Sequence, residues 1–151
     1  MNAARRAWNW TWSRFYRRLA DAHRHFGNLY ANQMEHWSAV ENYTRAIIYD
    51  PDYALAYYSR GILYWREIGN YYRAIQDLTR VLELAPTYAE AHFNRGMARK
   101  LRGELEKAME DFEQYLGQGT DEFWREAARR QVEELRSISS DAGEAQAQLH
   151  E

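Results

Sequence analysis

The sequence predicts an all-α fold built from repeated helix–turn–helix units, and three observations support this prediction. The chain has 151 residues with only two prolines and eight glycines, which disfavours a turn-rich β-sandwich. Hydrophobic residues make up 46% of the chain, enough to bury a core. Three segments align with one another at a fixed spacing, which is the signature of a repeat architecture.

The repeated region covers residues 20–117. Two of its three units close with a proline, Pro51 and Pro86, and proline cannot continue a helix. Two sets of small residues recur every 34 or 35 positions: Gly27, Gly61 and Gly96, and Ala39, Ala74 and Ala108. Apolar residues between these landmarks follow the period of an amphipathic helix. We therefore expect helices near residues 20–33, 36–49, 53–67, 71–84, 88–101 and 104–116.

Gly61 and Gly96 lie inside helical patterns, where glycine costs about 1 kcal/mol relative to alanine. Close approach of a neighbouring helix would offset this cost, with Ala74 and Ala108 as the small partners. The second unit also has one extra residue between Gly61 and Gly69. Its first helix should therefore end irregularly.

These features resemble the tetratricopeptide repeat (TPR), a helix–turn–helix unit of about 34 residues with small residues at helix crossings and a proline near its end. The second unit matches the signature at Tyr57, Gly61, Tyr64, Gly69, Ala74, Leu78, Val81 and Pro86. The first unit has Met34 where the inter-helix glycine would stand, and the third has Arg99 in place of an aromatic residue. The resemblance implies a right-handed α-solenoid of three TPR-like repeats in residues 20–117.

Residues 1–19 are expected to form a basic, tryptophan-rich leading helix. The first 20 residues contain five arginines and no acidic residue. Trp8, Trp12, Phe15 and Leu19 share one helix face, and Trp10 lies off it. Three interpretations remain open: packing on the first repeat, a surface for a partner or for self-association, and docking at a membrane interface. The candidate docking residues are Trp8, Trp10 and Trp12.

The C-terminal region is expected to contain a capping helix in residues 118–138 and a polar tail in residues 139–151. Thr120 is a suitable N-cap. An apolar stripe follows it, of the kind that protects the last hydrophobic face of a repeat array: Phe123, Ala127, Ala128, Val132 and Leu135. The tail is short and polar, so we expect it to be frayed.

The sequence contains no pattern typical of an enzyme. The absence of cysteine excludes thiolate metal sites and cysteine nucleophiles, and no glycine-rich phosphate loop occurs. The histidines lack ligand spacing, so we expect no metal and no cofactor. A net charge of −2 disfavours nucleic-acid binding through bulk basicity. No apolar run approaches the length of a membrane span or of a secretory signal, and we expect a cytoplasmic protein.

The resemblance implies that the first helices of the repeats line a concave groove that holds a peptide or helix of a partner protein. By position, the lining residues are Arg24, His25, Asn28, Tyr58, Ser59, Ile62, Trp65, Arg66, Phe93, Asn94, Met97 and Lys100. The sequence therefore predicts a non-catalytic scaffold, adaptor or assembly chaperone.

One ligand mode of the family is the clamp that holds the C-terminal carboxylate of heat-shock chaperones. Arg24 and Asn28 match its opening pair, but Ser59, Glu90 and Asn94 depart from the basic and amide residues expected next. Glu90 would repel a carboxylate. We therefore expect a peptide with apolar anchors. The alternatives are a structural subunit docked through the N-terminal helix and a membrane-peripheral assembly factor.

Overall fold

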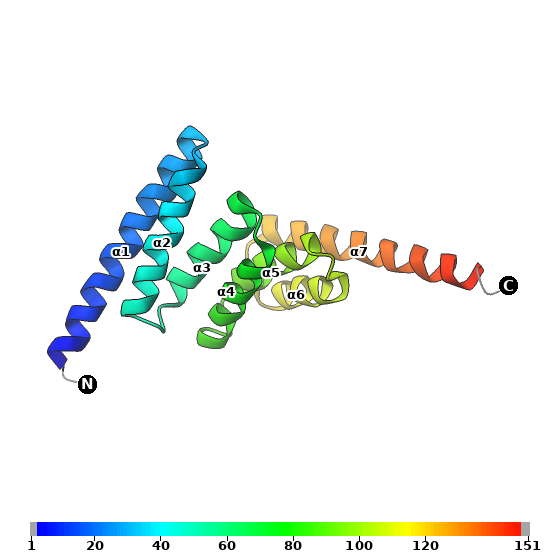
Figure 1. Cartoon of the computed structure of the whole chain (residues 1–151). Helices are drawn as coiled ribbons and strands as arrows, with labels where there is room; N and C mark the ends of the chain where they lie inside the picture. Colours follow the sequence, from blue (N-terminus) through cyan, green and yellow to red (C-terminus); the bar gives the residue numbers. More distant parts are fainter. Residues whose placement is uncertain (1–2, 149–151) are drawn as a thin grey trace. The chain divides into compact units, whose positions relative to one another are not determined.

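The computed structural model describes residues 3–148, with side chains placed for residues 3–140, and in this range every regular element is helical. The predicted all-α architecture of helix hairpins is confirmed (Figure 1). The elements are α1 (Ala3–Tyr30), α2 (Gln33–Tyr49), α3 (Ala54–Leu63), the π-helical turn η1 (Tyr64–Ile68), α4 (Tyr71–Leu84), α5 (Ala89–Leu101), α6 (Leu105–Gln118) and α7 (Glu122–Gln148).

The chain divides into two compact units, Met1–Pro86 and Thr87–Glu151. The first unit contains the hairpins α1–α2 and α3–α4, and α2 also packs on α3. The second contains the hairpin α5–α6, with α7 packed on α6. Three hairpins therefore correspond to the three predicted repeats.

Helix α1 differs from the expected N-terminal organisation. It continues without a break from Ala3 to Tyr30, so the predicted leading helix and the first helix of the first repeat are one element. It ends three residues earlier than expected because Ala31 adopts a left-handed φ of 50°. The side chain of Asn32 then caps α2 by accepting a hydrogen bond from the backbone N–H of Met34. Met34 consequently lies in the first turn of α2 and not between the helices.

The irregular end predicted for the second repeat is confirmed. The chain leaves α3 through the π-helical turn η1, and the backbone N–H of Asn70 donates to the carbonyl of Tyr64. A π-helical turn takes up one more residue than an α-helical turn, which accommodates the extra residue between Gly61 and Gly69. Gly69 closes the turn with a φ of 74°, a conformation that glycine adopts without a steric penalty.

The repeated glycines mark close helix crossings, as predicted, but their partners differ from those expected. A Cβ atom built on Gly61 would lie 3.0 Å from Cγ of Leu78, and one built on Gly96 would lie 3.0 Å from Cε1 of Phe112. The atoms nearest to each glycine therefore belong to Leu78 and Phe112, and not to the expected small partners Ala74 and Ala108. One helical turn further along, larger side chains reach across to fill the space above each glycine.

A buried aspartate joins the two helices of the second and third hairpins. In the second, Asp77 receives two hydrogen bonds of 2.8 Å from Arg60. In the third, Asp111 pairs with Arg95 and Arg99, and Nδ1 of His92 lies 3.3 Å from one of its oxygens. The pairing of Arg99 accounts for an arginine where the family pattern has an aromatic residue.

The core of the second unit confirms that α7 covers the third repeat. Ala128, Val132 and Leu135 of the predicted stripe are buried against α6 residues that include Phe112 and Tyr115. Phe123, the first residue of that stripe, is exposed. Helix α7 also extends to Gln148, so the expected frayed tail from residue 139 is wrong for residues 139–148. Residues 149–151 lie outside the described range.

Candidate functional site

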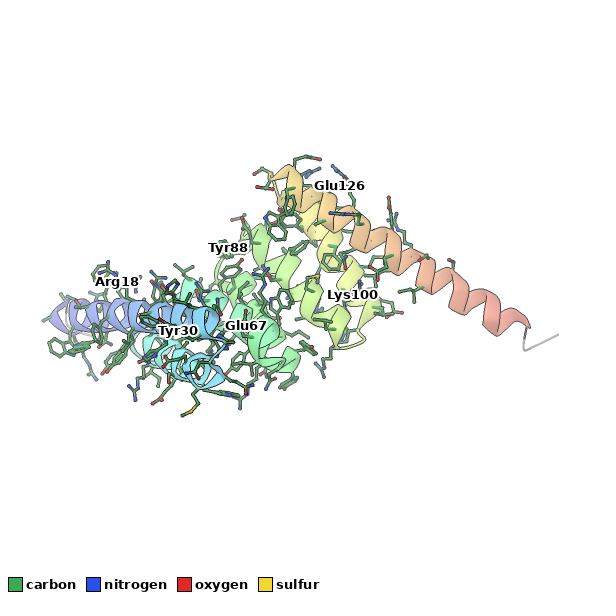
Figure 2. The ribbon with its side chains drawn as sticks, turned by 90° about the horizontal axis from the view of Figure 1, so that it is seen from above. Arg18, Tyr30, Glu67, Tyr88, Lys100 and Glu126 are labelled. Carbon is green, nitrogen blue, oxygen red and sulfur yellow. The ribbon has the colours of Figure 1, made fainter. Side chains whose placement is uncertain are left out.

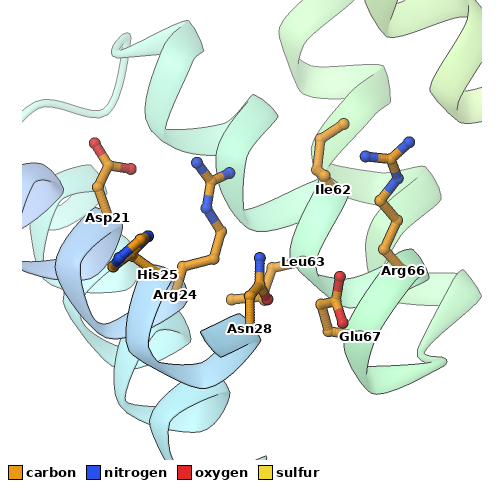
Figure 3. Close-up of a pocket in the computed structure, with 8 residues that line it drawn as sticks. All are labelled: Asp21, Arg24, His25, Asn28, Ile62, Leu63, Arg66 and Glu67. Carbon is orange, nitrogen blue, oxygen red and sulfur yellow. The ribbon is translucent and has the colours of Figure 1, made fainter. Parts of the chain in front are cut away.

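A cavity of about 300 Å³ lies in the first unit, between α1 and the α3–η1 segment (Figure 3). Its lining residues are Asp21, Arg24, His25, Asn28, Ile62, Leu63, Arg66 and Glu67. Five of them were predicted as groove residues: Arg24, His25, Asn28, Ile62 and Arg66. Sequence reasoning missed the other three, although Asp21 lies three and four residues before the predicted lining residues Arg24 and His25, and this helical spacing was a usable signal. We call this site the α1–α3 cavity.

Two arginines give the α1–α3 cavity its charge. Arg24 extends from α1 and Arg66 from η1, and Figure 3 shows both guanidinium groups extending in the same direction. Neither arginine forms an ion pair with any residue in the described part of the chain. The Arg66 guanidinium lies over the ring of Trp65, 5.1 Å from its centroid. Both guanidinium groups therefore have hydrogen-bond donors available for a ligand.

Asp21 does not cancel this positive charge, because its carboxylate already has two partners. Oδ2 accepts a hydrogen bond of 2.7 Å from Arg17, and Oδ1 accepts one of 2.6 Å from the hydroxyl of Tyr43. Burial raises the pKa of Tyr43, and the hydrogen bond to Asp21 raises that pKa further, so the hydroxyl remains a donor. Asp21 thus holds α1 against α2, and Glu67 is the remaining acidic residue of the cavity.

Asn28 is oriented by a histidine of the neighbouring helix. Its Oδ1 lies 2.9 Å from Nε2 of His36, and an amide oxygen is only an acceptor, so the histidine nitrogen donates. His36 is itself held close to Gly27, where a Cβ atom would overlap the imidazole ring. The amide nitrogen of Asn28 retains its two hydrogens for other acceptors. The cavity therefore combines two cations with one fixed amide donor.

Three other predicted groove residues of the first unit do not line the α1–α3 cavity. Ser59 is buried, and Tyr58 is half-buried. Trp65 is half-buried too, and its indole Nε1 is buried without a hydrogen-bond partner. The structure thus places these three residues of α3 and η1 outside the lining of the α1–α3 cavity.

In the second unit, the structure gives the predicted groove residues internal partners. Phe93 belongs to the core because rings of Phe112, Tyr115 and Trp124 surround it at centroid distances of 5.2–5.5 Å. Asn94 is buried and donates 2.7 Å to the carbonyl of Glu90. The remaining two also contact the body of this unit: Met97 packs on its core, and Lys100 forms an ion pair of 2.6 Å with Glu134 of α7. The placement of Phe93 and Asn94 in a binding surface is therefore wrong.

The three candidate docking tryptophans of α1 have different environments. Trp12 is half-buried and stacks on Tyr49 of α2 with 6.4 Å between ring centroids. Trp8 and Trp10 are exposed. Arg14 approaches the ring of Trp10 at 5.1 Å while pairing with Asp50 at 2.6 Å. Packing on the first repeat thus accounts for Trp12 but leaves Trp8 and Trp10 on the surface.

Two further features of the described residues concern metal binding and membrane insertion. No cluster of three or more histidine or acidic residues in this part of the chain is arranged to hold a metal ion. None of the described helices combines the length and the apolar character that a membrane span requires.

Comparisons with known proteins identify the repeats. A family model described as TPR repeat matches residues 35–67, and a second, described as tetratricopeptide repeat, matches residues 66–123. The second TPR of Spaghetti (RPAP3), solved with the HSP90 peptide SRMEEVD, is 32% identical over 68% of this chain and 94% of that chain, with a TM-score of 0.56. This chain belongs to the tetratricopeptide-repeat family.

Other solved TPR domains are similar over a larger part of the chain. The second TPR domain of human RPAP3, in complex with the HSP70 peptide SGPTIEEVD, is 28% identical over 80% of this chain and 98% of that chain, with a TM-score of 0.62. The Arabidopsis OM64 TPR domain is 22% identical over 86% and 98%, with a TM-score of 0.72, and shows the same fold. No curated protein matches the chain significantly. The TPR fold and the peptide complexes among these neighbours support a protein-interaction module.

Proposed function

We propose that this TPR protein is a non-catalytic adaptor or scaffold that binds an acidic, extended segment of a partner protein in the α1–α3 cavity. The observation that carries the proposal is the presence in one cavity of the guanidinium groups of Arg24 and Arg66, which form no ion pair with any described residue, beside the oriented amide of Asn28. Because Asp21 is already neutralised by Arg17, the cavity has an excess of positive charge over Glu67. An acidic ligand balances this excess.

Each group has a defined part in binding. Arg24 and Arg66 pair with ligand carboxylates, and guanidinium groups bind carboxylates through two parallel hydrogen bonds. The Asn28 amide donates to a backbone carbonyl of the ligand, and Ile62 supplies an apolar contact. Partly solvated ion pairs contribute about 0–1 kcal/mol each, so we expect weak binding that depends on several contacts and on salt.

The apolar anchors of the ligand lie along α3 and η1 in this proposal. Phe93 is a core residue and Lys100 pairs with Glu134, so neither serves the ligand. The half-buried rings of Tyr58 and Trp65 are the aromatic residues that extend the binding surface beyond the cavity.

The ligand mode differs from recognition of a C-terminal carboxylate. Two neighbouring structures contain peptides ending in EEVD, whose side chains and C-terminus are both acidic. Here Ser59 and Asn94 are buried, and Asn94 donates to its own helix. We therefore propose that acidic side chains within the segment, and not its terminal carboxylate, make the main contacts.

Calorimetric titration with the peptide SRMEEVD and with its C-terminally amidated form tests the proposal. We expect similar affinities for the two forms, and a loss of roughly two- to fivefold for Arg24→Ala and for Arg66→Ala that shrinks at high salt. Arg45→Ala is the matched control, because Arg45 lies on α2 and pairs with Glu41 outside the cavity. Absence of binding, or affinities equal to wild type in both cavity variants, would contradict the proposal.

A further inference from the structure

Helix α1 carries one stripe of small residues and one of apolar residues, and only the first is buried along its whole length. The first consists of Ser13, Ala20 and Gly27, which are buried. The second follows alternating intervals of four and three residues along nearly the whole helix. We call it the heptad stripe, and it consists of Trp8, Trp12, Phe15, Leu19, Ala22, Phe26 and Leu29.

The heptad stripe is open to solvent over most of its length. The exposed fractions are 61% for Trp8, 49% for Phe15 and 60% for Leu29, and Trp12 is the half-buried member. The ring of Trp12 contacts those of Trp8 and Phe15 with 5.5 Å between centroids. These edge-on contacts order the N-terminal half of the stripe into a ridge of aromatic rings.

The spacing of this ridge indicates the shape of its ligand. Apolar residues at alternating intervals of three and four, kept over about three heptads, form the contact line of a coiled coil. A helix that lies in a membrane interface has a wider apolar face than this narrow line. The stripe therefore fits one partner helix better than a lipid surface.

The charge around the stripe indicates the chemistry of that helix. Residues 1–20 contain five arginines and no acidic residue. Within the described part of the chain, Arg5, Arg6 and Arg18 form no ion pair. Figure 2 labels Arg18 on α1, and Leu19 of the stripe is the next residue in the sequence. Antiparallel pairing of two copies of α1 would bring their Arg18 residues together near the middle of the stripe, because Arg18 directly precedes Leu19. Parallel pairing would align the two arginine-rich segments of residues 1–20, which contain no carboxylate. Like charges therefore oppose self-association in both directions.

We propose that the heptad stripe of α1 docks one helix of a different protein, an acidic amphipathic helix with apolar residues at heptad spacing. Its apolar residues pack between the rings of the stripe, and its flanking carboxylates pair with Arg5 and Arg18. This site is separate from the α1–α3 cavity, which uses Arg24 and Asn28 on another face of the same helix.

A designed peptide tests the proposal on the full-length protein. The probe is a labelled peptide of about three heptads with leucine at positions a and d and glutamate at e and g. Repulsion between its glutamates keeps it from pairing with itself. The control peptide carries lysine at e and g. Fluorescence anisotropy measures binding, and we expect the glutamate peptide to bind at least about tenfold more tightly than the lysine peptide.

Variants of exposed residues locate the site without threatening the fold. Leu19→Glu places a charge in the middle of the stripe and should weaken binding of the glutamate peptide by roughly a hundredfold, and Arg18→Glu by roughly tenfold. Ile48→Glu is the control, because Ile48 is an equally apolar, exposed residue of α2. Circular dichroism checks that each variant is folded.

Four outcomes would overturn the proposal. The first is equal affinity for the two peptides, and the second is unchanged binding by Leu19→Glu. The third is a dimer of the protein alone, seen by sedimentation equilibrium and lost in Leu19→Glu, which would assign the stripe to a second copy. The fourth is binding to phosphatidylserine vesicles, but not to the peptide, that Leu19→Glu abolishes, which would assign it to a membrane.

Discussion

The two long helices of the protein, α1 in the first unit and α7 in the second, differ in how much of their apolar surface is buried. Both are amphipathic and close in length, 28 and 27 residues. Helix α7 has a stripe that is buried on α6, and charged residues such as Arg129 and Glu122 pair on its outer surface. Helix α1 buries a stripe of small residues and leaves its heptad stripe exposed over most of its length. A helix can therefore carry more apolar surface than the rest of its own chain buries. The apolar surface that stays exposed is a candidate binding site for a partner protein.

Removal of α7 is the largest change that this comparison suggests. Deletion of residues 120–151 would expose Ala108, Phe112 and Tyr115, which are now buried beneath it. We expect the truncated protein to associate or to lose its cooperative melting transition, because terminal repeats require a polar outer cap. Light scattering and thermal melting measure both effects. Deletion of residues 141–151 alone, which spares the covering residues of α7, should leave both unchanged, and a monomeric 1–119 fragment would show that α7 is dispensable.

A leucine-to-glutamate substitution on each helix tests directly whether the substituted residue is buried. Leu135 on α7 is 3% exposed, whereas Leu19 on α1 is 37% exposed. Leu135→Glu should cost roughly 3–5 kcal/mol of unfolding free energy, because it removes buried apolar volume and introduces an unpaired carboxylate. Leu19→Glu should change this free energy by less than about 0.5 kcal/mol. Urea denaturation gives both values, and a large loss in Leu19→Glu would mean that the heptad stripe is covered within the chain.

The second and third hairpins differ in the environment of the buried aspartate that joins their helices. Burial alone would raise the pKa of Asp111, but hydrogen bonds from His92 and Arg95 and the charges of Arg95 and Arg99 lower it below the ordinary value. Burial raises the pKa of Asp77, which has Arg60 as its ion-pair partner. Asp111→Asn should therefore lower the free energy of unfolding by about 3 kcal/mol, because it leaves buried cations without a counter-charge. Asp77→Asn should lower it by less.

The loss of stability in Asp111→Asn should depend on pH, because the pKa of Asp111 is lowered in the folded state. A carboxyl group with a lowered pKa in the folded state stabilises the fold above its unfolded pKa of about 4. The stability gap between wild type and Asp111→Asn should narrow as the pH falls below that value. Denaturant melts over an acidic pH series measure the gap. A gap that stays constant would show that Asp111 acts through packing and not through its charge.

The smallest of the expected losses of stability concerns the helix crossing at Gly61. This crossing lies within the second hairpin, so its stability should not depend on how far α1 and α7 are covered. Gly61→Leu should cost roughly 1–3 kcal/mol, because its side chain must displace Leu78 and Asp77. Gly117→Leu is the control, since a Cβ atom at Gly117 meets no atom within 4 Å. Equal melting temperatures for the two variants would contradict the crossing that the structure places at Gly61.

Sequence reasoning identified part of the candidate site for a physical reason. Arg24, Asn28 and Arg66 were predicted because the resemblance to the TPR family implies that the first helix of each repeat lines the groove, and a cavity forms beside these residues. Phe93 and Asn94 were misplaced because the same periodicity does not show how deep in the core a position lies. Their burial depends on Trp124 of α7 and on a hydrogen bond to the backbone at Glu90.

The sequence by itself determined the repeat period, the number of hairpins, the glycine crossings and the irregular end of the first helix in the second repeat. These features depend on the backbone conformations and helical spacing of residues close together in the chain, which are local properties. Only the tertiary structure decided where the first repeat turns, which side chains fill the space above Gly61 and Gly96, and which stripe of α1 is buried. Each of these depends on the shape of a neighbouring helix, and a face becomes core only when a complementary surface covers it.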